Sequence, residues 1–110
     1  MRGFMSKLRD YAKGKECQVR IPGVCNFNPE TTVLAHLNQI GISGRSLKAP
    51  DQLAAWCCSA CHDEVDERTH NYHMWNIPED EPWAHQIIQL AFLEGIMRTQ
   101  YELIQKGLIK

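Results

Sequence analysis

The longest regular pattern of hydrophobic and polar positions lies near the C-terminus. Between Trp83 and Lys106, apolar side chains recur mostly at intervals of three and four residues: Ile87, Leu90, Phe92, Leu93, Ile96, Met97, Tyr101 and Ile104. Pro82 suits the first turn of such a helix and Gly107 suits its C-terminal cap. We therefore predict a C-terminal helix over 83–107 that packs against the core or a partner and carries no chemistry.

Shorter patterns upstream predict an α+β chain, because some stretches alternate or are β-branched while others suit helices. In chain order, we expect a basic helix over residues 5–13 that stops at Gly14, strands over Cys17–Ile21, Thr31–His36 and Gln52–Cys57, a helix from Cys58 to about His70, and a loop insertion over 71–82. The first strand is closed by Pro22-Gly23, a strong turn pair. A short helix following two paired strands is thus part of the expected architecture.

Composition narrows the class of protein. The chain has 110 residues, of which 44% are hydrophobic and 23% charged, as in one small globular domain over 1–110. The N-terminus has no apolar run of the signal-peptide kind, and no stretch is apolar enough to span a bilayer, so we expect a cytosolic protein without membrane contact. Disulfides are rare in that compartment, so the five cysteines point first to metal binding.

Charge is unevenly distributed along the chain. Residues 1–62 carry eight Lys/Arg and four Asp/Glu, a net charge of +4, whereas residues 63–110 carry four and nine, a net charge of -5. The basic part could face nucleic acid, although a solvated surface explains the same charges equally well. The overall charge of -1 does not by itself argue for a DNA-binding protein.

Four cysteines have the spacing of a structural zinc site. The Pro22-Gly23 turn can fold Cys17 and Cys25 back onto one point, while Cys58 and Cys61 form a Cys-x-x-Cys pair at a helix start. Four thiolates around one Zn²⁺ make a closed site. A redox Cys-x-x-Cys and inert buried thiols are the alternatives, but no thioredoxin-like βαβ pattern surrounds the pair. Cys57 is interpreted as a small core residue.

Histidines and a carboxylate near this cluster form a second candidate site. His62 directly follows Cys61, Asp66 lies four residues further on the same helical face, and His70 lies near the end of the helix. These side chains could ligate a divalent cation such as Mg²⁺, Mn²⁺ or Zn²⁺. His36, at the end of a predicted strand, is a candidate general base because imidazole ionises near neutral pH. Incidental surface histidines are the alternative.

The order of these motifs resembles the zinc-knuckle form of the HNH nuclease family. The resemblance rests on Cys17 and Cys25, then Ala35-His36, then a glycine-containing loop with Lys48 and Asp51, then Cys58-x-x-Cys61-His62. More closely, the stretches 16–26 and 60–70 resemble a family of prophage-encoded nucleases. This second resemblance covers nearly the whole chain.

The resemblance implies a zinc-stapled ββα-metal fold, a β-hairpin followed by a helix around a metal, with an additional long C-terminal helix. It implies His36 as general base and His62 as a ligand of the catalytic cation. Ala35 stands where many members carry an Asp or His ligand, and Asp51 is the nearest match to the family's central Asn. Asp66 and His70 are therefore candidates for the missing ligand. We expect His36 and His62 to face each other across a cleft beside the zinc.

The function implied is metal-dependent hydrolysis of nucleic-acid phosphodiester bonds, those of DNA first, by a protein of phage or prophage origin. Candidate phosphate contacts are Lys13, Lys15, Arg45 and Lys48. The alternative function is a non-catalytic, zinc-stapled module that binds nucleic acid or protein. The sequence does not decide whether the substrate is DNA or RNA, or whether cleavage is by nicking or through both strands. Homo-oligomer formation also stays open.

Overall fold

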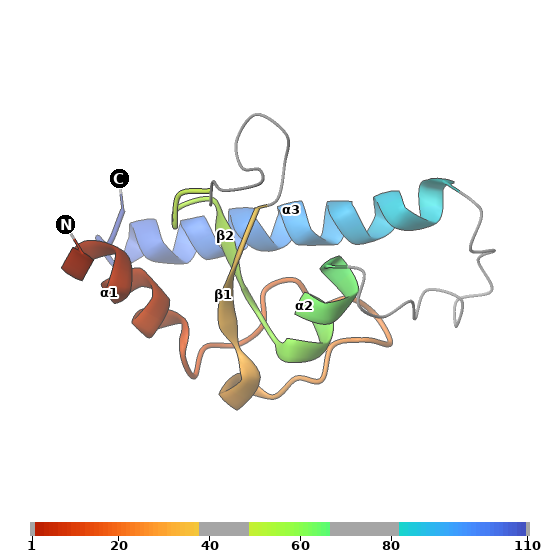
Figure 1. Ribbon diagram of the computed structural model, residues 1–110, viewed down its shortest axis with the longest axis horizontal. Coiled ribbons are helices and arrows are strands. Elements are labelled where there is room, and N and C mark those ends of the chain that lie inside the picture. The colour runs from red at the N-terminus through yellow and green to blue at the C-terminus, as the bar shows by residue number, and fades with distance from the viewer. Residues whose placement is uncertain (1, 38–48, 67–81, 110) are drawn as a thin grey trace.

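The computed structural model describes residues 2–37, 49–66 and 82–109 of the chain (Figure 1). In these ranges the chain forms a small α+β structure, with α1 over Arg2–Ala12, a 3-10 helix η1 over Pro29–Thr31, β1 over Val33–His36, β2 over Ala54–Cys57, α2 over Ser59–Val65 and α3 over Pro82–Gln105. The loop insertion predicted at 71–82 lies, apart from Pro82, outside the described residues, as do Arg45, Lys48 and His70.

The two strands pair as an antiparallel hairpin, from Val33 opposite Cys57 to His36 opposite Ala54. The outer edge of β2 is covered by other parts of the chain. The backbone carbonyl of Trp56 accepts from the Gln18 amide at 2.8 Å, and the Trp56 amide donates to Thr99 Oγ1 in α3 at 3.0 Å. These bonds satisfy backbone groups that an exposed edge strand would leave to solvent or to another chain.

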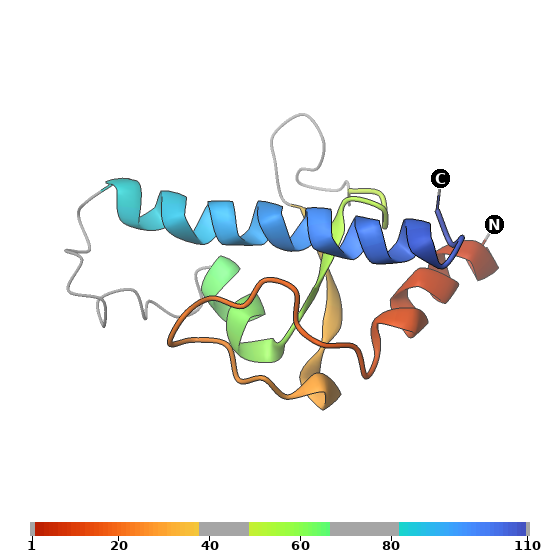
Figure 2. The same cartoon turned by 180° about the vertical axis from the view of Figure 1, so that it is seen from behind.

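Side chains alternate across this hairpin, so its two faces belong to two clusters of buried residues. On one face, Leu34, Ala54 and Trp56 pack with Leu8 and Ala12 of α1 and Leu103 of α3. On the opposite face, Ala35, Ala55 and Cys57 pack with the segment from Cys17 to Cys25, which we call the cysteine-containing segment, and with the start of α2. The same cluster includes Ile88, Phe92 and Ile96 of α3. The long helix thus contributes to both clusters, and in Figure 2 it runs the length of the molecule in front of the hairpin.

The helix predicted near the C-terminus is confirmed as α3. It ends in a left-handed glycine cap, because Gly107 has φ +73°. The Gly107 amide donates to the Ile104 carbonyl at 3.0 Å and the Leu108 amide to the Leu103 carbonyl at 2.9 Å. This pair of bonds satisfies carbonyls that the last turn leaves without an intrahelical partner. The predicted N-terminal helix is also present, and Gly14, with φ +79°, follows its end.

The strand predicted over Cys17–Ile21 is wrong. Arg20 adopts a left-handed conformation with φ +54°, which breaks an extended strand. The amides of Arg20 and Ile21 donate to the sulfurs of Cys17 and Cys61 and not to a neighbouring strand. The other two predicted strands are present in shorter form, since residues 29–31 form η1 and β2 begins at Ala54. The helix predicted from Cys58 is described as far as Val65, with Asp66 as its cap.

Among the described helices, none is both long and apolar enough to cross a membrane.

Gly95 lets α3 pack closely against Val19, between Cys17 and Cys25. A Cβ atom built on Gly95 would lie 2.8 Å from Val19 Cγ2 and 3.0 Å from Val19 Cα. Alanine normally stabilises a helix interior relative to glycine by about 1 kcal/mol. Here we expect Gly95→Ala to lower the free energy of unfolding by about 1–3 kcal/mol, because the backbone of residue 19 must shift. Urea unfolding measures this, with Gln105→Ala as an exposed control; a stabilised Gly95→Ala variant would contradict it.

Candidate metal centre and active site

Four cysteines from two distant parts of the chain meet at one point. Cys17 and Cys25 lie on the segment between α1 and η1, and Cys58 and Cys61 lie at the start of α2. The predicted turn brings the first two together, since Gly23 has φ +75° and the Cys25 amide donates to the Ile21 carbonyl at 2.9 Å. All four sulfurs lie within 4.8 Å of one another.

Backbone amides point at three of these sulfurs. The Arg20 amide donates to Cys17 Sγ at 3.4 Å, the Ile21 amide to Cys61 Sγ at 3.4 Å and the Cys61 amide to Cys58 Sγ at 3.3 Å. Amide donors stabilise thiolate relative to thiol, and thiolate is the form that binds metal. The Cys58 side chain is also the N-cap of α2, so the same contact sets the start of this helix.

The spacing of the sulfurs fits a tetrahedral metal. Sulfurs held about 2.3 Å from a central zinc lie about 3.8 Å from one another, and Cys25 Sγ lies 3.8 Å from Cys58 Sγ. None of the five cysteines forms a disulfide, and Cys17, Cys58 and Cys61 are buried while Cys25 is partly exposed. The cluster can therefore bind a metal ion such as Zn²⁺, as its spacing in the sequence predicts.

Without a metal, the thiols of this centre share protons unequally. Hydrogen bonds from the Cys57 and Cys61 thiols hold the pKa of Cys17 far below its ordinary value, despite burial. The same hydrogen bonds to Cys17 raise the pKa of Cys57 and of Cys61. Burial raises the pKa of Cys25 to about 11. A metal ion that bound all four ligands would displace these protons.

Cys57 is fully buried in the core, as interpreted from the sequence, but its thiol lies beside Cys17. It is not among the four cysteines whose sulfurs all lie within 4.8 Å of one another. Its place on β2 opposite Val33 puts it next to the cluster without making it a ligand in this arrangement.

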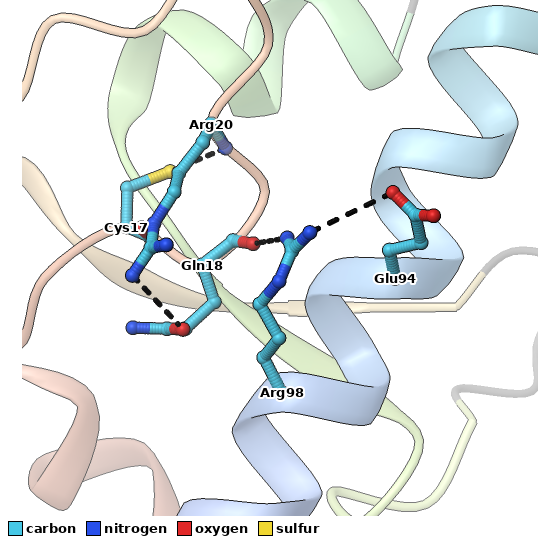
Figure 3. A network of polar contacts seen from close by, with 5 residues as sticks. All are labelled: Cys17, Gln18, Arg20, Glu94 and Arg98. Atoms are coloured by element: carbon cyan, nitrogen blue, oxygen red, sulfur yellow. Dashed lines mark hydrogen bonds and ion pairs between the residues drawn. The ribbon is translucent and has the colours of Figure 1, made fainter.

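Two arginines fix the cysteine-containing segment in place (Figure 3). Arg20 Nε donates to the Cys17 carbonyl at 3.0 Å, which closes the loop around the first ligand. Arg98 of α3 donates to the Gln18 carbonyl at 2.6 Å and lies 3.6 Å from Glu94 one turn earlier. Charge-assisted donors to backbone carbonyls are stronger than neutral ones. Cys17 is therefore held by its own loop and by the long helix.

His36 pairs with a buried carboxylate. Its Nε2 lies 2.5 Å from Asp51 Oδ1, and Asp51 is 3% exposed. Arg9 of α1 approaches the second oxygen of Asp51, with Nε at 4.0 Å. When neutral His36 donates Nε2–H to Asp51, its Nδ1 is the unprotonated nitrogen and can accept a proton. This pairing of an imidazole with an orienting carboxylate suits general-base chemistry.

The pairing of His36 with Asp51 is not predicted from the sequence. The resemblance to HNH nucleases points to Asp51 only as the nearest match to that family's central asparagine. Fifteen residues separate the pair, and no periodicity relates them. The position of Asp51 near the start of β2, which runs antiparallel to β1, brings it to the end of β1 where His36 lies.

His62 pairs with Asp66 as the helical spacing predicts. His62 Nε2 lies 3.2 Å from Asp66 Oδ2, and both side chains are about one-third exposed. His62 immediately follows the buried ligand Cys61, so α2 carries an accessible histidine next to the cysteine cluster. Two such groups can contribute to a cation site, although they are fewer than a cation normally needs.

Within the described residues, His36 and His62 do not belong to one group of ligands close enough to share an ion, and that they face each other across a cleft stays a prediction. In those parts of the chain, the four cysteines are the only group of three or more Cys, His, Asp or Glu side chains close enough to hold one ion. His36 and Leu34 project from the same face of β1, whereas Cys61 of α2 packs with the opposite face. His36 with Asp51 and His62 with Asp66 are thus two separate pairs.

The basic residues of the N-terminal arm have local partners. Lys13 lies 3.7 Å from Asp10, and both are largely exposed. The Lys15 ammonium lies 4.1 Å from the centre of the Tyr11 ring. Lys13 is exposed and Lys15 is partly exposed, and contact with a phosphate stays a prediction for both.

Comparison with known proteins identifies the family of this chain. The model of the family described as "Putative nuclease YbcO" matches residues 6–108. The chain belongs to the YbcO family. It is 49% identical over 106 residues to the curated "Putative nuclease YbcO" of Escherichia coli (strain K12), which covers 96% of this chain and 99% of that protein. Identity and coverage are the same for the "Putative nuclease ybcO" of Enterobacteria phage 82.

A solved structure is similar to the chain in fold and sequence. "Structure of a putative bacteriophage protein from Escherichia coli str. K-12 substr. MG1655" matches with a TM-score of 0.69 and 44% identity, over 92% of this chain and all of that one. The name of the YbcO family agrees with the nuclease function expected from the sequence, without specifying metal or substrate. The relative from a phage agrees with the expected phage relation.

Proposed function

We propose that this YbcO-family chain is a metal-dependent endonuclease of the HNH type, acting in the cytosol on nucleic-acid phosphodiester bonds, those of DNA first. The observation that best supports this is the His36–Asp51 pair: a partly exposed imidazole with a buried carboxylate behind it. The element order β1, β2, α2 agrees with the proposed ββα-metal hairpin and helix. We propose that they belong to one HNH-like domain over 1–110.

In this mechanism, His36 supplies the base. Its Nδ1 takes a proton from water, and the resulting hydroxide attacks the phosphorus while the bond to the 3′ oxygen breaks. Asp51 accepts the Nε2–H and stabilises the imidazolium that forms. A divalent cation held by His62 with Asp66 and His70 would stabilise charge on the phosphate and the leaving oxygen when bound. Arg9, near Asp51, adds positive charge on the same side of the hairpin.

The cysteine cluster has a structural role in this proposal. Zn²⁺ bound by Cys17, Cys25, Cys58 and Cys61 joins the loop before β1 to the start of α2, and so sets the positions of both candidate pairs. The cluster has no open position for substrate once four thiolates are bound. Lys13, Lys15, Arg45 and Lys48 are proposed to hold the phosphate backbone without reading bases.

A second candidate function is a non-catalytic, zinc-stapled module that binds nucleic acid or protein. What favours it is the small number of ligands beside His62: among the described residues only Asp66 pairs with it, and the four cysteines are the only group large enough to hold an ion.

A cleavage assay separates the two functions. We expect the purified chain to cut supercoiled plasmid or branched DNA with Mg²⁺ or Mn²⁺, and a mild chelator that spares the cysteine-bound zinc to stop it. RNA of matched length tests the preference for DNA. Binding without cleavage at every metal would favour the module and defeat the nuclease proposal.

A further inference from the structure

The helix α3 is apolar on two opposite sides. One side is buried and carries Ile88, Phe92, Ile96 and Leu103. The other remains exposed in the monomer and carries Leu90, Leu93, Met97, Tyr101 and Ile104, which we call the α3 stripe. Each of these five side chains is between 44% and 61% exposed. A helix with apolar side chains on opposite sides is normally buried on both, so we expect another molecule to cover the α3 stripe.

The spacing of the α3 stripe is symmetrical about Met97. Going outward from Met97, the next positions are four residues away in both directions, at Leu93 and Tyr101, and then seven away, at Leu90 and Ile104. At about 100° per residue, all five point within about 40° of Met97. Two copies packed antiparallel would therefore place Met97 against Met97, Leu93 against Tyr101 and Leu90 against Ile104.

Area and charge also suit a second copy. The exposed parts of the α3 stripe and the neighbouring Ile87 amount to on the order of 1,200 Å² for two copies, which is the size of a small specific interface. The five side chains of the α3 stripe have no charged residue among them; Glu94 lies about 60° from Met97, between the stripe and Ile87, and pairs with Arg98. Figure 2 shows the α3 ribbon running uncrossed in front of the hairpin.

We propose that the chain forms a two-fold symmetric homodimer through the α3 stripe, with the two helices antiparallel and Met97 at the symmetry axis. Such an isologous contact buries the same patch of both subunits, and steps of three and four residues keep the stripe on one side of the helix. This proposal does not depend on nuclease activity.

Mass measurement by light scattering tests the dimer. We expect the wild type at micromolar concentration to have twice the 12.7 kDa mass of one chain. Met97→Glu should raise the dimer dissociation constant by about a hundredfold or more, because two charges would meet at the axis. Gln105→Glu, exposed on the flank of the same helix, should leave it unchanged. Circular dichroism and zinc content confirm folding of both variants. A monomeric wild type, or a dimer insensitive to Met97→Glu, would overturn the proposal.

Cross-linking tests the orientation. In the antiparallel arrangement, position 93 lies level with position 101 of the partner and about 12 Å along the axis from the partner's position 93. A mixture of Leu93→Cys and Tyr101→Cys chains should form a disulfide-linked dimer in a glutathione buffer, whereas Leu93→Cys alone should not. The wild-type chain is the control for disulfide cross-linking through the native cysteines. The reverse pattern would indicate parallel helices and reject the symmetry proposed.

A second, independent observation concerns the loop after Cys25. Phe27 is 77% exposed, the most exposed of the large hydrophobic side chains in the described residues, and has a left-handed backbone with φ +54°. Phenylalanine in this conformation costs on the order of 1 kcal/mol, and an exposed ring regains little of it by packing. Phe27 lines a cavity of about 350 Å³ with Glu16, Cys17, Arg20 and Pro29.

The loop that presents Phe27 is held firmly. The Asn28 amide donates to Asn26 Oδ1 at 2.9 Å, and Asn26 Nδ2 donates to Thr31 Oγ1 at 3.2 Å and to Ser59 Oγ of α2 at 3.1 Å. These bonds tie the loop to the start of α2 beside the cysteine cluster. A ring fixed in this way loses little conformational freedom when a ligand stacks on it.

We infer that Phe27 and the adjoining cavity bind an unpaired nucleobase of the nucleic-acid substrate, which rests on the proposed function. Bases of any sequence stack on aromatic rings, and arginine adds a favourable cation. The lining includes one acidic and one basic side chain, Glu16 and Arg20, so its formal charges balance, which suits a base better than a phosphate. The substrate class would then be single-stranded or branched nucleic acid.

Binding to labelled oligothymidine and to a duplex of equal length tests this inference by fluorescence anisotropy. Phe27→Ala should weaken single-strand binding about five- to a hundredfold and leave duplex binding unchanged. Phe27→Tyr should bind like the wild type, and Val33→Ala, another exposed apolar position, should have no effect. The same comparison in a His36→Ala background separates this inference from catalysis. The inference is rejected if Phe27→Ala lowers the affinity for both nucleic acids equally or for neither. It is also rejected if the site binds an apolar peptide in place of nucleic acid.

Discussion

Cys58→Ser is expected to unfold most of the chain at room temperature. Four-thiolate zinc contributes on the order of 10 kcal/mol to the folding of small domains, comparable to the whole stability of a protein of this size. Cys58 has two functions here, because its sulfur is both a ligand and the N-cap of α2. Serine can keep the cap but binds zinc far more weakly. Zinc content by elemental analysis and urea unfolding give the result.

Cys57→Ser is the matched control for this loss. Cys57 is as deeply buried as Cys58 and adjacent in sequence, but it is not one of the four clustered ligands. We expect it to retain one zinc per chain and lose only about 1 kcal/mol, mainly from a changed hydrogen bond with Cys17. A metal-free wild type that stays fully folded, or equal damage from the two substitutions, would refute a structural zinc at these cysteines.

His36→Ala is expected to lose hydrolysis by about a hundredfold or more, the usual contribution of a positioned general base. The side chain is partly exposed at the end of β1 and its removal opens no large cavity in the core. Zinc content, circular dichroism and nucleic-acid affinity should therefore match the wild type. Single-turnover cleavage with Mg²⁺ or Mn²⁺ measures the rate without interference from product release.

Asp51→Asn tests whether the carboxylate positions this base. We expect kcat to fall while KM stays near the wild-type value, since Asp51 touches His36 and not the substrate in this proposal. If Asp51→Asn loses activity only because the fold is less stable, activity returns when the assay temperature is lowered. That result would indicate a structural role for this buried carboxylate. Full activity of His36→Ala would remove His36 from the mechanism and leave the base unassigned.

Much of the architecture is determined by local sequence. The three- and four-residue spacing of α3, its glycine cap at Gly107 and the stop at Gly14 depend on helix period and backbone freedom, which act over a few residues. The Pro22-Gly23 turn and the Cys-x-x-Cys spacing are also local, so the four cysteines could be predicted as one cluster. The helical spacing of His62 and Asp66 predicted their contact for the same reason.

Only the tertiary structure decided the features that join distant segments. Residues 17–21 look like a strand in sequence, yet the amides of Arg20 and Ile21 donate to cysteine sulfurs, and Cys61 comes from forty residues further along the chain. The pairing of His36 with Asp51 comes from the register of β1 against β2, and register depends on packing across the whole hairpin. Arg9 of α1 then approaches the same carboxylate, a contact that depends on how α1 packs against the hairpin. Which side of α3 stays exposed is likewise set by the hairpin it packs on, because the sequence carries apolar residues on both.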